Sequence, residues 1–184
     1  MTRGATAWLR SAVALLLALV VARSAVGQDG QLELAVKATY LAKLSPFVAW
    51  PGEAAQFPGG VFAICVVGRD PFGVLLDRAV SGQTVAGRPV TVRRLETVAT
   101  SPPCSLVYIA AGNAAALAAV QDQPILTVTD QTAEPQAKGI INFVIHDNRV
   151  RFEIDDAAAA RSGLGISSKL LSLAVAVRPR SGPR

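Results

Sequence analysis

A near-continuous apolar run, VFAICVV at residues 61–67, constrains the fold of this chain more than any other segment. Runs of this kind are typical of strands buried on both faces, which occur mainly in parallel sheets. A loop with two glycines follows, and Leu75, Leu76 and Ala79 then indicate a short helix. The strand–loop–helix order predicts an α/β unit whose sheet is covered by helices.

A first helix is expected over residues 31–50, ahead of that strand. Its apolar residues recur at spacings of four, four and three, and Lys37 and Lys43 fall off this stripe. Pro46 lacks an amide proton and predicts the end of the regular helix. Trp50 is either a large core side chain or an exposed contact residue. The stripe residues are Val36, Tyr40, Leu44 and Phe47.

The rest of the chain indicates further strands and helices of the same domain. Asp147-Asn148 tolerates positive φ and suits the turn of a hairpin. The predicted fold class is therefore α/β: a single three-layer domain with a mostly parallel central sheet, helices on both faces and a β-hairpin at one edge. The expected elements are strands at 90–93, near the sheet edge, and at 106–109, 125–128, 140–145 and 149–154, a helix at 114–120, and an irregular loop at 130–138.

The segment VRFEIDDAAAARSGLGISSKLLSLA, which starts at residue 150, indicates a strand followed by two capped helices. Val150, Phe152 and Ile154 alternate with charged residues, as in a half-buried strand. Asp155 stands where an N-cap belongs, and Gly163 ends the alanine-rich run. Because capping accounts for most polar groups here, few remain for catalysis.

The amino terminus has the pattern of a secretory signal peptide. Arg3 and Arg10 precede an apolar core at 11–22, which is shorter than the ~20 residues that span a bilayer. Cleavage after Gly27 would remove three arginines and no acid, so the net charge falls from +5 to +2. We therefore expect a signal peptide at 1–27 and one exported domain at 28–184; the alternative is an uncleaved membrane anchor.

Two cysteines, Cys65 and Cys104, lie in a chain that is expected to enter an oxidising compartment. A disulfide between them would close a loop of about 40 residues and contribute roughly 4 kcal/mol to stability. The alternative is two separate buried thiols. Intact-mass comparison with and without reductant distinguishes them.

Catalytic groups are scarce. The one histidine, His146, stands beside the expected hairpin turn, so no metal site or catalytic dyad is predicted. The loop Asp70–Gly73 lacks the glycine spacing and the lysine of nucleotide-binding loops, and Asp70 is expected to cap the next helix. No cofactor and no enzyme function are predicted. A basic patch with interleaved aromatic residues is also absent, so nucleic acid is not an expected partner.

The second helix of the carboxyl-terminal segment offers a candidate binding site. Ser167 is expected as its N-cap, and Lys169 then falls in the first turn, where a cation opposes the helix dipole by about 0.3–1 kcal/mol. With Ser168 these groups form a seat for an anion, or else the lysine extends into water. The full set of candidate contact residues is Trp50, Arg149, Arg151, Glu153, Ser167, Ser168 and Lys169.

Segments along nearly all of the mature chain resemble the YfiR family (YfiR/HmsC-like) in one order. The matching segments are Lys37-Ala38, Tyr40-Leu41, Phe47 to Pro51, Ile64 to Val66 with Gly68, Asp70 to Gly73, Gly87 to Val90, Val92 to Arg94, Cys104, Leu126 to Asp130, Gly139 to Val144, Val150 to Asp155, Leu164 and Ile166 to Leu171.

This resemblance implies a periplasmic regulator without catalytic activity. Its partner would be the periplasmic domain of an inner-membrane diguanylate cyclase, whose repression lowers cyclic di-GMP and biofilm formation. The resemblance also implies sequestration by an outer-membrane lipoprotein, redox control through cysteines, and a homodimer. This chain departs from many relatives at Lys43-Leu44, where they have Asn-Phe, and its two cysteines cannot form a second disulfide. The alternative function is a periplasmic domain that binds a small anionic metabolite in a sensory system.

Overall fold

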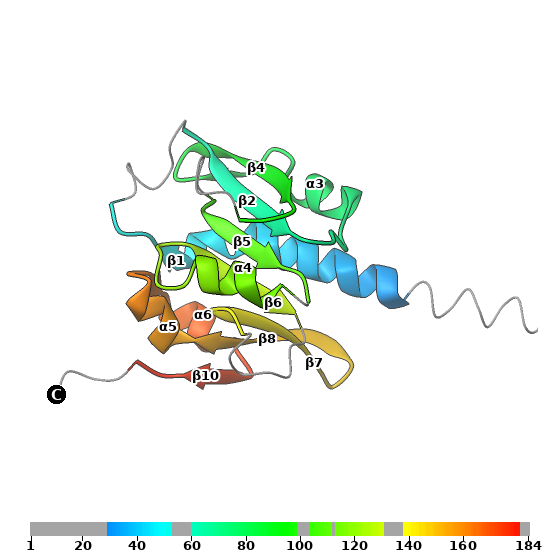
Figure 1. The fold of residues 1–184 in the computed structure, drawn as a ribbon. Coiled ribbons are helices and arrows are strands. Elements are labelled where there is room, and N and C mark those ends of the chain that lie inside the picture. Colours follow the sequence, from blue (N-terminus) through cyan, green and yellow to red (C-terminus); the bar gives the residue numbers. More distant parts are fainter. Residues whose placement is uncertain (1–28, 53–59, 99–103, 112, 131–137, 181–184) are drawn as a thin grey trace, which may run out of the picture.

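The computed structural model describes residues 29–52, 60–98, 104–111, 113–130 and 138–180. The predicted signal peptide and most of the predicted loop at 130–138 lie outside this part of the chain. A long helix at residues 29–43 crosses one side of a central sheet, and α4 covers the other side (Figure 1). The other helices are η1 (Ser45–Phe47), α3 (Val74–Val80), α4 (Ala114–Ala119), α5 (Asp156–Arg161) and α6 (Ser168–Leu171).

The central sheet has eight strands in the order β10-β8-β7-β6-β5-β2-β4-β3. All neighbouring pairs are parallel except β7–β8 and β3–β4, so the predicted α/β class with a mostly parallel sheet is confirmed. A separate antiparallel pair joins β1 to β9. The strands are β1 (Val48–Ala49), β2 (Phe62–Val67), β3 (Thr84–Val85), β4 (Arg88–Leu95), β5 (Leu106–Ile109), β6 (Leu126–Asp130), β7 (Ile141–His146), β8 (Arg149–Asp155), β9 (Gly165–Ile166) and β10 (Ala176–Arg178).

The predicted hairpin forms, but one strand inside the edge. Its turn residues Asp147 and Asn148 have φ angles of 50° and 55°, as the tight turn requires. The chain then returns after α6, and Val175 donates a hydrogen bond to the Phe152 carbonyl at 3.0 Å. This contact aligns β10 parallel to β8 and makes β10 the edge strand. The sequence did not predict β10, because its three residues directly continue the apolar pattern of the preceding helix.

The sheet separates two apolar cores, because alternate side chains of its central strands point to opposite faces. We call the face toward residues 29–43 the helix face and the opposite one the α4 face. The helix-face core spans the sheet from β2 to β8, whereas the α4-face core involves β2 and β5. Sheet residues of the helix-face core include Phe62, Ile64, Leu106, Leu126, Ile141, Phe143, Phe152 and Ile154; those of the α4-face core are Ala63, Cys65, Val67, Val107 and Ile109.

A disulfide joins Cys65 to Cys104 within the α4-face core, with Cα atoms 5.9 Å apart. Both cysteines are buried. Cys104 stands just ahead of β5, which pairs with β2, so adjacent strands bring the two residues together. The disulfide prediction is confirmed, and the alternative of two separate thiols is wrong.

Lys37 is buried, contrary to the prediction that places it off the apolar stripe. Its side chain is 2% exposed, and its ammonium contacts Glu33 and lies 2.8 Å from both carboxylate oxygens of Asp130 at the end of β6. The buried side of the helix is centred on Ala38 and Leu41 rather than on the predicted stripe. Lys37 lies at the edge of that side, and its long aliphatic chain places the ammonium against the Asp130 carboxylate.

Tyr108 completes this cluster from the neighbouring strand β5. Its hydroxyl lies 3.3 Å from an Asp130 carboxylate oxygen and donates to it. Burial, followed by the charge of Asp130, raises the pKa of Tyr108 far above its usual value, so the phenol stays protonated as a donor. We call Glu33, Lys37, Tyr108 and Asp130 the lysine cluster.

Candidate functional site

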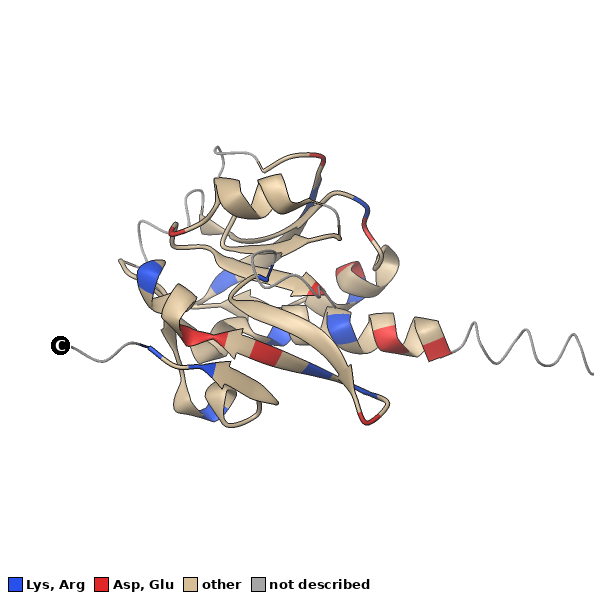
Figure 2. Cartoon of the chain, turned by 60° about the horizontal axis from the view of Figure 1, so that its bottom comes forward, with Lys and Arg blue, Asp and Glu red and all other residues tan. Residues whose placement is uncertain are grey.

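Two of the three charged residues predicted on β8, Arg151 and Glu153, lie on the α4 face, opposite the buried Phe152 and Ile154, whereas Arg149 beside the hairpin turn lines a hollow with Leu32 of the helix at residues 29–43. Arg149, Arg151 and Glu153 alternate with Phe152 and its neighbours, which are buried in the helix-face core. Figure 2 shows the resulting change from basic to acidic colour along this strand. Arg149 is exposed and the other two are half-buried, so these side chains remain available at the surface.

A polar network supports the acidic end of this strand. Lys138 donates to Glu153 at 2.7 Å, and the Asn142 amide donates to the same oxygen at 3.2 Å. The Thr129 hydroxyl in turn donates to Asn142 at 3.0 Å and accepts from the Gly139 amide. The hydrogen bond from Lys138, reinforced by Asn142, outweighs burial and lowers the pKa of Glu153. We call these residues, Thr129, Lys138, Gly139, Asn142 and Glu153, the polar network.

The α4 face is therefore divided into two halves. Beneath α4 it is apolar and carries the disulfide, whereas along β6, β7 and β8 it carries buried Thr127, Thr129 and Asn142 and then the β8 charges. Sequence reasoning missed the polar half because it took residues 125–128 as a uniformly buried strand. A signal was present, since Thr127 and Thr129 alternate with Leu126 and Val128.

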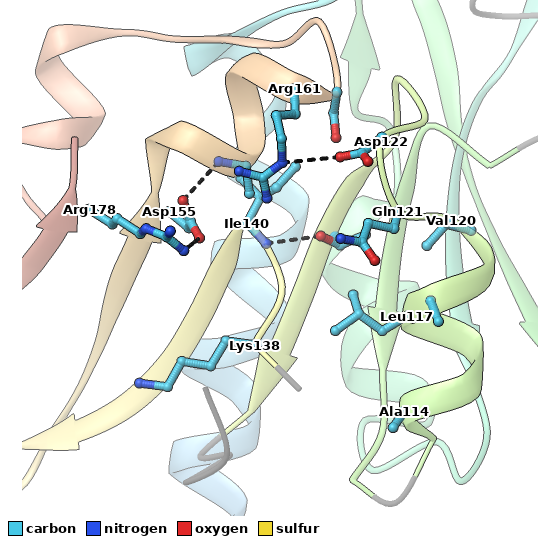
Figure 3. A pocket seen from close by; sticks show the side chains of 14 residues that line it. Ala114, Leu117, Val120, Gln121, Asp122, Lys138, Ile140, Asp155, Arg161 and Arg178 are labelled. Carbon is cyan, nitrogen blue, oxygen red and sulfur yellow. Dashed lines mark hydrogen bonds and ion pairs between the residues drawn. The ribbon is translucent and has the colours of Figure 1, made fainter. Parts of the chain in front are cut away.

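A groove of about 540 Å³ separates the two halves, between α4 and α5 (Figure 3). Arg161 pairs with Asp122 across it, and Arg178 pairs with Asp155, both at 3.2 Å. A second hollow of about 340 Å³ shares Asp155, Arg178 and Lys138 with the groove and continues over the polar network. The apolar residues that line the groove include Leu117, Val120, Ile140 and Ala158.

The predicted caps of α5 are confirmed, and they fix one wall of the groove. The Asp155 carboxylate accepts from the Ala158 amide at 2.8 Å, and Gly163 has a φ of 70° just past the helix. Asp156 is buried and receives two hydrogen bonds from Arg180, at 2.8 and 2.9 Å. These bonds tie the segment after β10 to the start of α5.

Trp50 is 6% exposed, so the alternative of an exposed contact residue is wrong. Its ring packs edge-on against Phe62, with centroids 5.4 Å apart. Pairing of β1 with β9 holds the preceding residues, Val48 and Ala49, against the body of the domain. The ring therefore belongs to the helix-face core.

Ser167, Ser168 and Lys169 lie apart from the β8 charges. Ser167 caps α6 as predicted, accepting from the Leu170 amide at 3.2 Å, and Leu170 packs into the helix-face core. Lys169 follows the N-cap by two residues, so it lies in the first turn as predicted; because α6 is a single turn of four residues, that turn is also its last. Its ammonium lies 5.8 Å from the centroid of the Phe47 ring, a cation–π contact that accounts for its position.

The side chain of Arg94 contacts the loop that follows β2. Asp70 is not the N-cap of α3, because Gly73 takes that position with a φ of 49°. Asp70 instead accepts from the Phe72 amide at 2.7 Å and from Arg94 at 2.6 Å, and Arg94 also reaches Asp77. Burial raises the pKa of Asp70, but these hydrogen bonds outweigh it and the pKa is lowered. Arg94 thus holds the loop Asp70–Gly73 in place through hydrogen bonds to Asp70 and to the Gly73 carbonyl.

The described residues contain no cluster of three or more His, Cys, Asp or Glu side chains placed to hold a metal ion. In the same part of the chain, no helix combines the length and apolar character needed to cross a membrane.

These features define a disulfide-containing α/β domain with a groove and a charged face. A family model described as YfiR/HmsC-like matches residues 34–175, and the chain belongs to that family. The family comprises non-catalytic periplasmic regulators in cyclic di-GMP signalling. No curated protein matches the chain.

Proposed function

We propose that this chain binds the periplasmic domain of an inner-membrane diguanylate cyclase and represses the enzyme. The charged strand face of Arg149, Arg151 and Glu153 carries the proposal, because these side chains are not used by either core. Such a regulator acts only by binding the inactive cyclase conformation more tightly than the active one. The chain itself performs no catalysis.

The electrostatics of this face suit a protein partner. Glu153 is held by the polar network, so the acidic end of the face has a fixed position. Arg149 and Arg151 form no ion pair with any other residue that the structure describes. Their guanidinium groups can therefore bind carboxylates of a partner through two parallel hydrogen bonds. We therefore expect an acidic patch on the cyclase domain opposite the two arginines.

Charge reversal of Arg149 and Arg151 tests this function. In cells that carry the chain and its cyclase, Arg149→Glu/Arg151→Glu should raise cyclic di-GMP to the level of a deletion strain. Binding of the purified variant to the cyclase periplasmic domain should weaken by at least about tenfold. Arg78→Glu on exposed α3 is the matched control and should leave both readouts unchanged. Full repression by the double variant would contradict the assignment of this face.

Export and the other partners belong to the same proposal. We propose that residues 1–27 are removed on export, that an outer-membrane lipoprotein sequesters the regulator, and that the active form is a homodimer. Intact mass of the periplasmic protein tests the first point, because cleavage after Gly27 predicts a chain that starts at Gln28. A chain that retains residues 1–27 would identify the membrane-anchored alternative.

The groove between α4 and α5 favours a second candidate function, the binding of a small anionic metabolite. Its volume of about 540 Å³ falls in the range of small-molecule sites, and it is lined by Lys138, Arg161 and Arg178, each paired with a carboxylate that a bound anion would have to displace. A thermal-shift panel of organic acids and phosphates tests it. A stabilising ligand whose effect is lost in Arg161→Ala but kept in Arg78→Ala would support this function; no shift with any anion would exclude it.

A further inference from the structure

The outer edge of β10 directs backbone hydrogen-bonding groups away from the sheet. β10 is the outermost strand, and among the described residues it pairs with β8 alone (Figure 1). Val175 donates to the Phe152 carbonyl of β8, and a parallel ladder uses alternate residues, so Val175 and Val177 bond to β8. Ala176 and Arg178 therefore direct their amides and carbonyls outward. An extended chain is the structure that can pair with such a row of backbone groups.

An apolar row follows the same edge. Val175 and Val177 are 41% and 38% exposed, and Leu173 just before them is 52% exposed. They are three of the six large apolar side chains that are exposed in the described part of the chain. Both valines continue the row of Phe152 and Ile154 in the helix-face core, because residues in register point to the same side of a sheet. The helix-face core is thus incompletely covered at this edge, and one more strand would bury the two valines.

The two edges of the central sheet differ in their protection against strand pairing. Natural edges are usually kept short or carry charges and prolines. β3, at the opposite edge, has two residues, and its exposed one is Thr84. At β10 the protection is confined to the carboxyl end, where Arg178 is followed by Pro179, whereas residues 173–177 are all apolar. This distribution favours an edge that binds a strand over one that excludes it.

The edge adjoins the β8 charges that carry the proposed function. Ala176 lies beside Glu153 in register, and the hollow of about 340 Å³ over the polar network extends to Ala176 and Arg178. The Arg178 side chain is 70% exposed, and its contact with Asp155 is 3.2 Å long, so it is accessible to a second carboxylate. A strand bound at this edge therefore meets apolar groups on the helix face and a cation on the α4 face.

We propose that the outer edge of β10 receives an extended segment of the cyclase periplasmic domain, which adds a ninth strand to the sheet. The alternate side chains of this segment are apolar beside the two valines and acidic or polar beside Ala176 and Arg178. Main-chain hydrogen bonds supply affinity in this mode of recognition, and the alternating side chains supply specificity. The inference rests on the proposed function for the identity of the partner, and it extends the contact surface from the β8 charges to the sheet edge.

A proline at position 176 tests the backbone pairing. Ala176→Pro removes only the outward amide, so β10 remains paired with β8. Binding of the purified mature chain to the cyclase periplasmic domain should weaken by at least about tenfold, because a buried carbonyl of the bound segment loses its donor. Ala176→Ser keeps the amide and is the matched control, which should bind like the wild type.

The same titrations separate this inference from the proposed function. If Ala176→Pro binds like the wild type while Arg149→Glu/Arg151→Glu does not, the edge pairing is overturned and the proposed function stands. If the wild type does not bind the cyclase domain, the proposed function fails and the edge pairing falls with it.

Hydrogen exchange of the wild-type chain tests the pairing without a substitution. In the free chain the Val177 amide, which is bonded to β8, should exchange more slowly than the outward Ala176 amide. Addition of the cyclase domain should slow exchange at Ala176 by at least about tenfold, because this amide then donates to the bound segment. Unchanged exchange of Ala176 in the complex would overturn the proposal.

A charge in the apolar row tests the side-chain part of the proposal. Val177→Glu should weaken cyclase binding by about tenfold or more, because it places a carboxylate between apolar side chains. Val74→Glu, at a valine of α3 that is 61% exposed, is the matched control and should bind normally. Sedimentation identifies the other occupant: if Ala176→Pro and Val177→Glu abolish self-association but keep cyclase binding, a second copy occupies the edge and the proposal is overturned.

Discussion

The two faces of the sheet differ in how far their apolar cores extend. Within the part of the chain that the structure describes, the helix-face core runs from β2 to β8, and the buried charges beside it, Lys37 and Asp156, are both paired. The α4-face core stops beyond β5, and the rest of that face is polar, grooved and charged. This difference indicates that the helix face holds the domain together, while the polar half of the α4 face is free to meet a ligand or a partner. Removing groups from each face should therefore give effects of different size.

The largest loss of stability is expected from the lysine cluster. Lys37→Ala removes the cation and leaves Asp130 and Glu33 without their partner, which should lower the free energy of unfolding by about 3–5 kcal/mol. Urea denaturation followed by circular dichroism measures this change. Lys43→Ala, six residues later on the exposed side of the same helix, is the control and should change stability by less than about 0.5 kcal/mol. Similar small losses in both variants would show that the buried ion pairs do not hold the helix.

The disulfide should give the next largest effect, from the apolar half of the α4 face. Cys65→Ala/Cys104→Ala should lower stability by about 2–4 kcal/mol, because the unfolded chain gains the freedom of an open loop. The melting temperature, measured with and without reductant, tests this. Reductant should lower the wild-type value toward that of the variant and leave the variant unchanged. An unchanged wild-type melting temperature after confirmed reduction would contradict the prediction.

The contrast between the faces also explains what sequence could and could not predict. Apolar runs such as residues 61–67 define strands by local pattern, and the caps at Asp155 and Gly163 act within a few residues, so these features were accessible. The burial of Lys37 was not accessible, because its partner Asp130 is 93 residues away in the chain. Hydrophobic periodicity describes one helix or strand at a time. It therefore cannot distinguish a charged residue that is paired with another element from one that is exposed to solvent.

The candidate site was predictable to a similar extent. The alternation along β8 predicted that Arg151 and Glu153 share the face opposite the buried Phe152 and Ile154, and the structure confirms this; the contact of Arg149 with the hollow beside the helix at residues 29–43 was not predicted. The groove depends instead on the meeting of α4 with α5 and on the pairing of β10 with β8, which no local motif encodes. The contact of Lys169 with Phe47 could not be predicted, because Phe47 belongs to another element of the chain; the role of Lys169 in binding stays a prediction.

A moderate effect is expected from the polar half of the α4 face. Asn142→Ala deprives the Thr129 hydroxyl and Glu153 of a buried partner and should lower stability by about 1–3 kcal/mol. Chemical denaturation measures this loss. Val144→Ala, the next residue on the same face of β7, is half-buried and should cost less. If Asn142→Ala left the free energy of unfolding unchanged, the polar half of the α4 face would not contribute to stability. The two faces of the sheet would then differ in stability even more than proposed.

The smallest effect should come from the end of the polar network, and it should depend on pH. The pKa of Glu153 is lowered in the folded chain by Lys138 and Asn142, so its contribution to stability is complete above the unfolded value of 4.5. The contribution is lost as the pH falls through the lower folded value, since the carboxylate must then be protonated. Glu153→Gln should therefore be less stable than the wild type at pH 7, and the two should converge in acid. Glu96→Gln, an exposed change, should show no such convergence. Because the lysine cluster is untouched by this variant, a large loss at pH 7 would show that the polar half also holds the domain together.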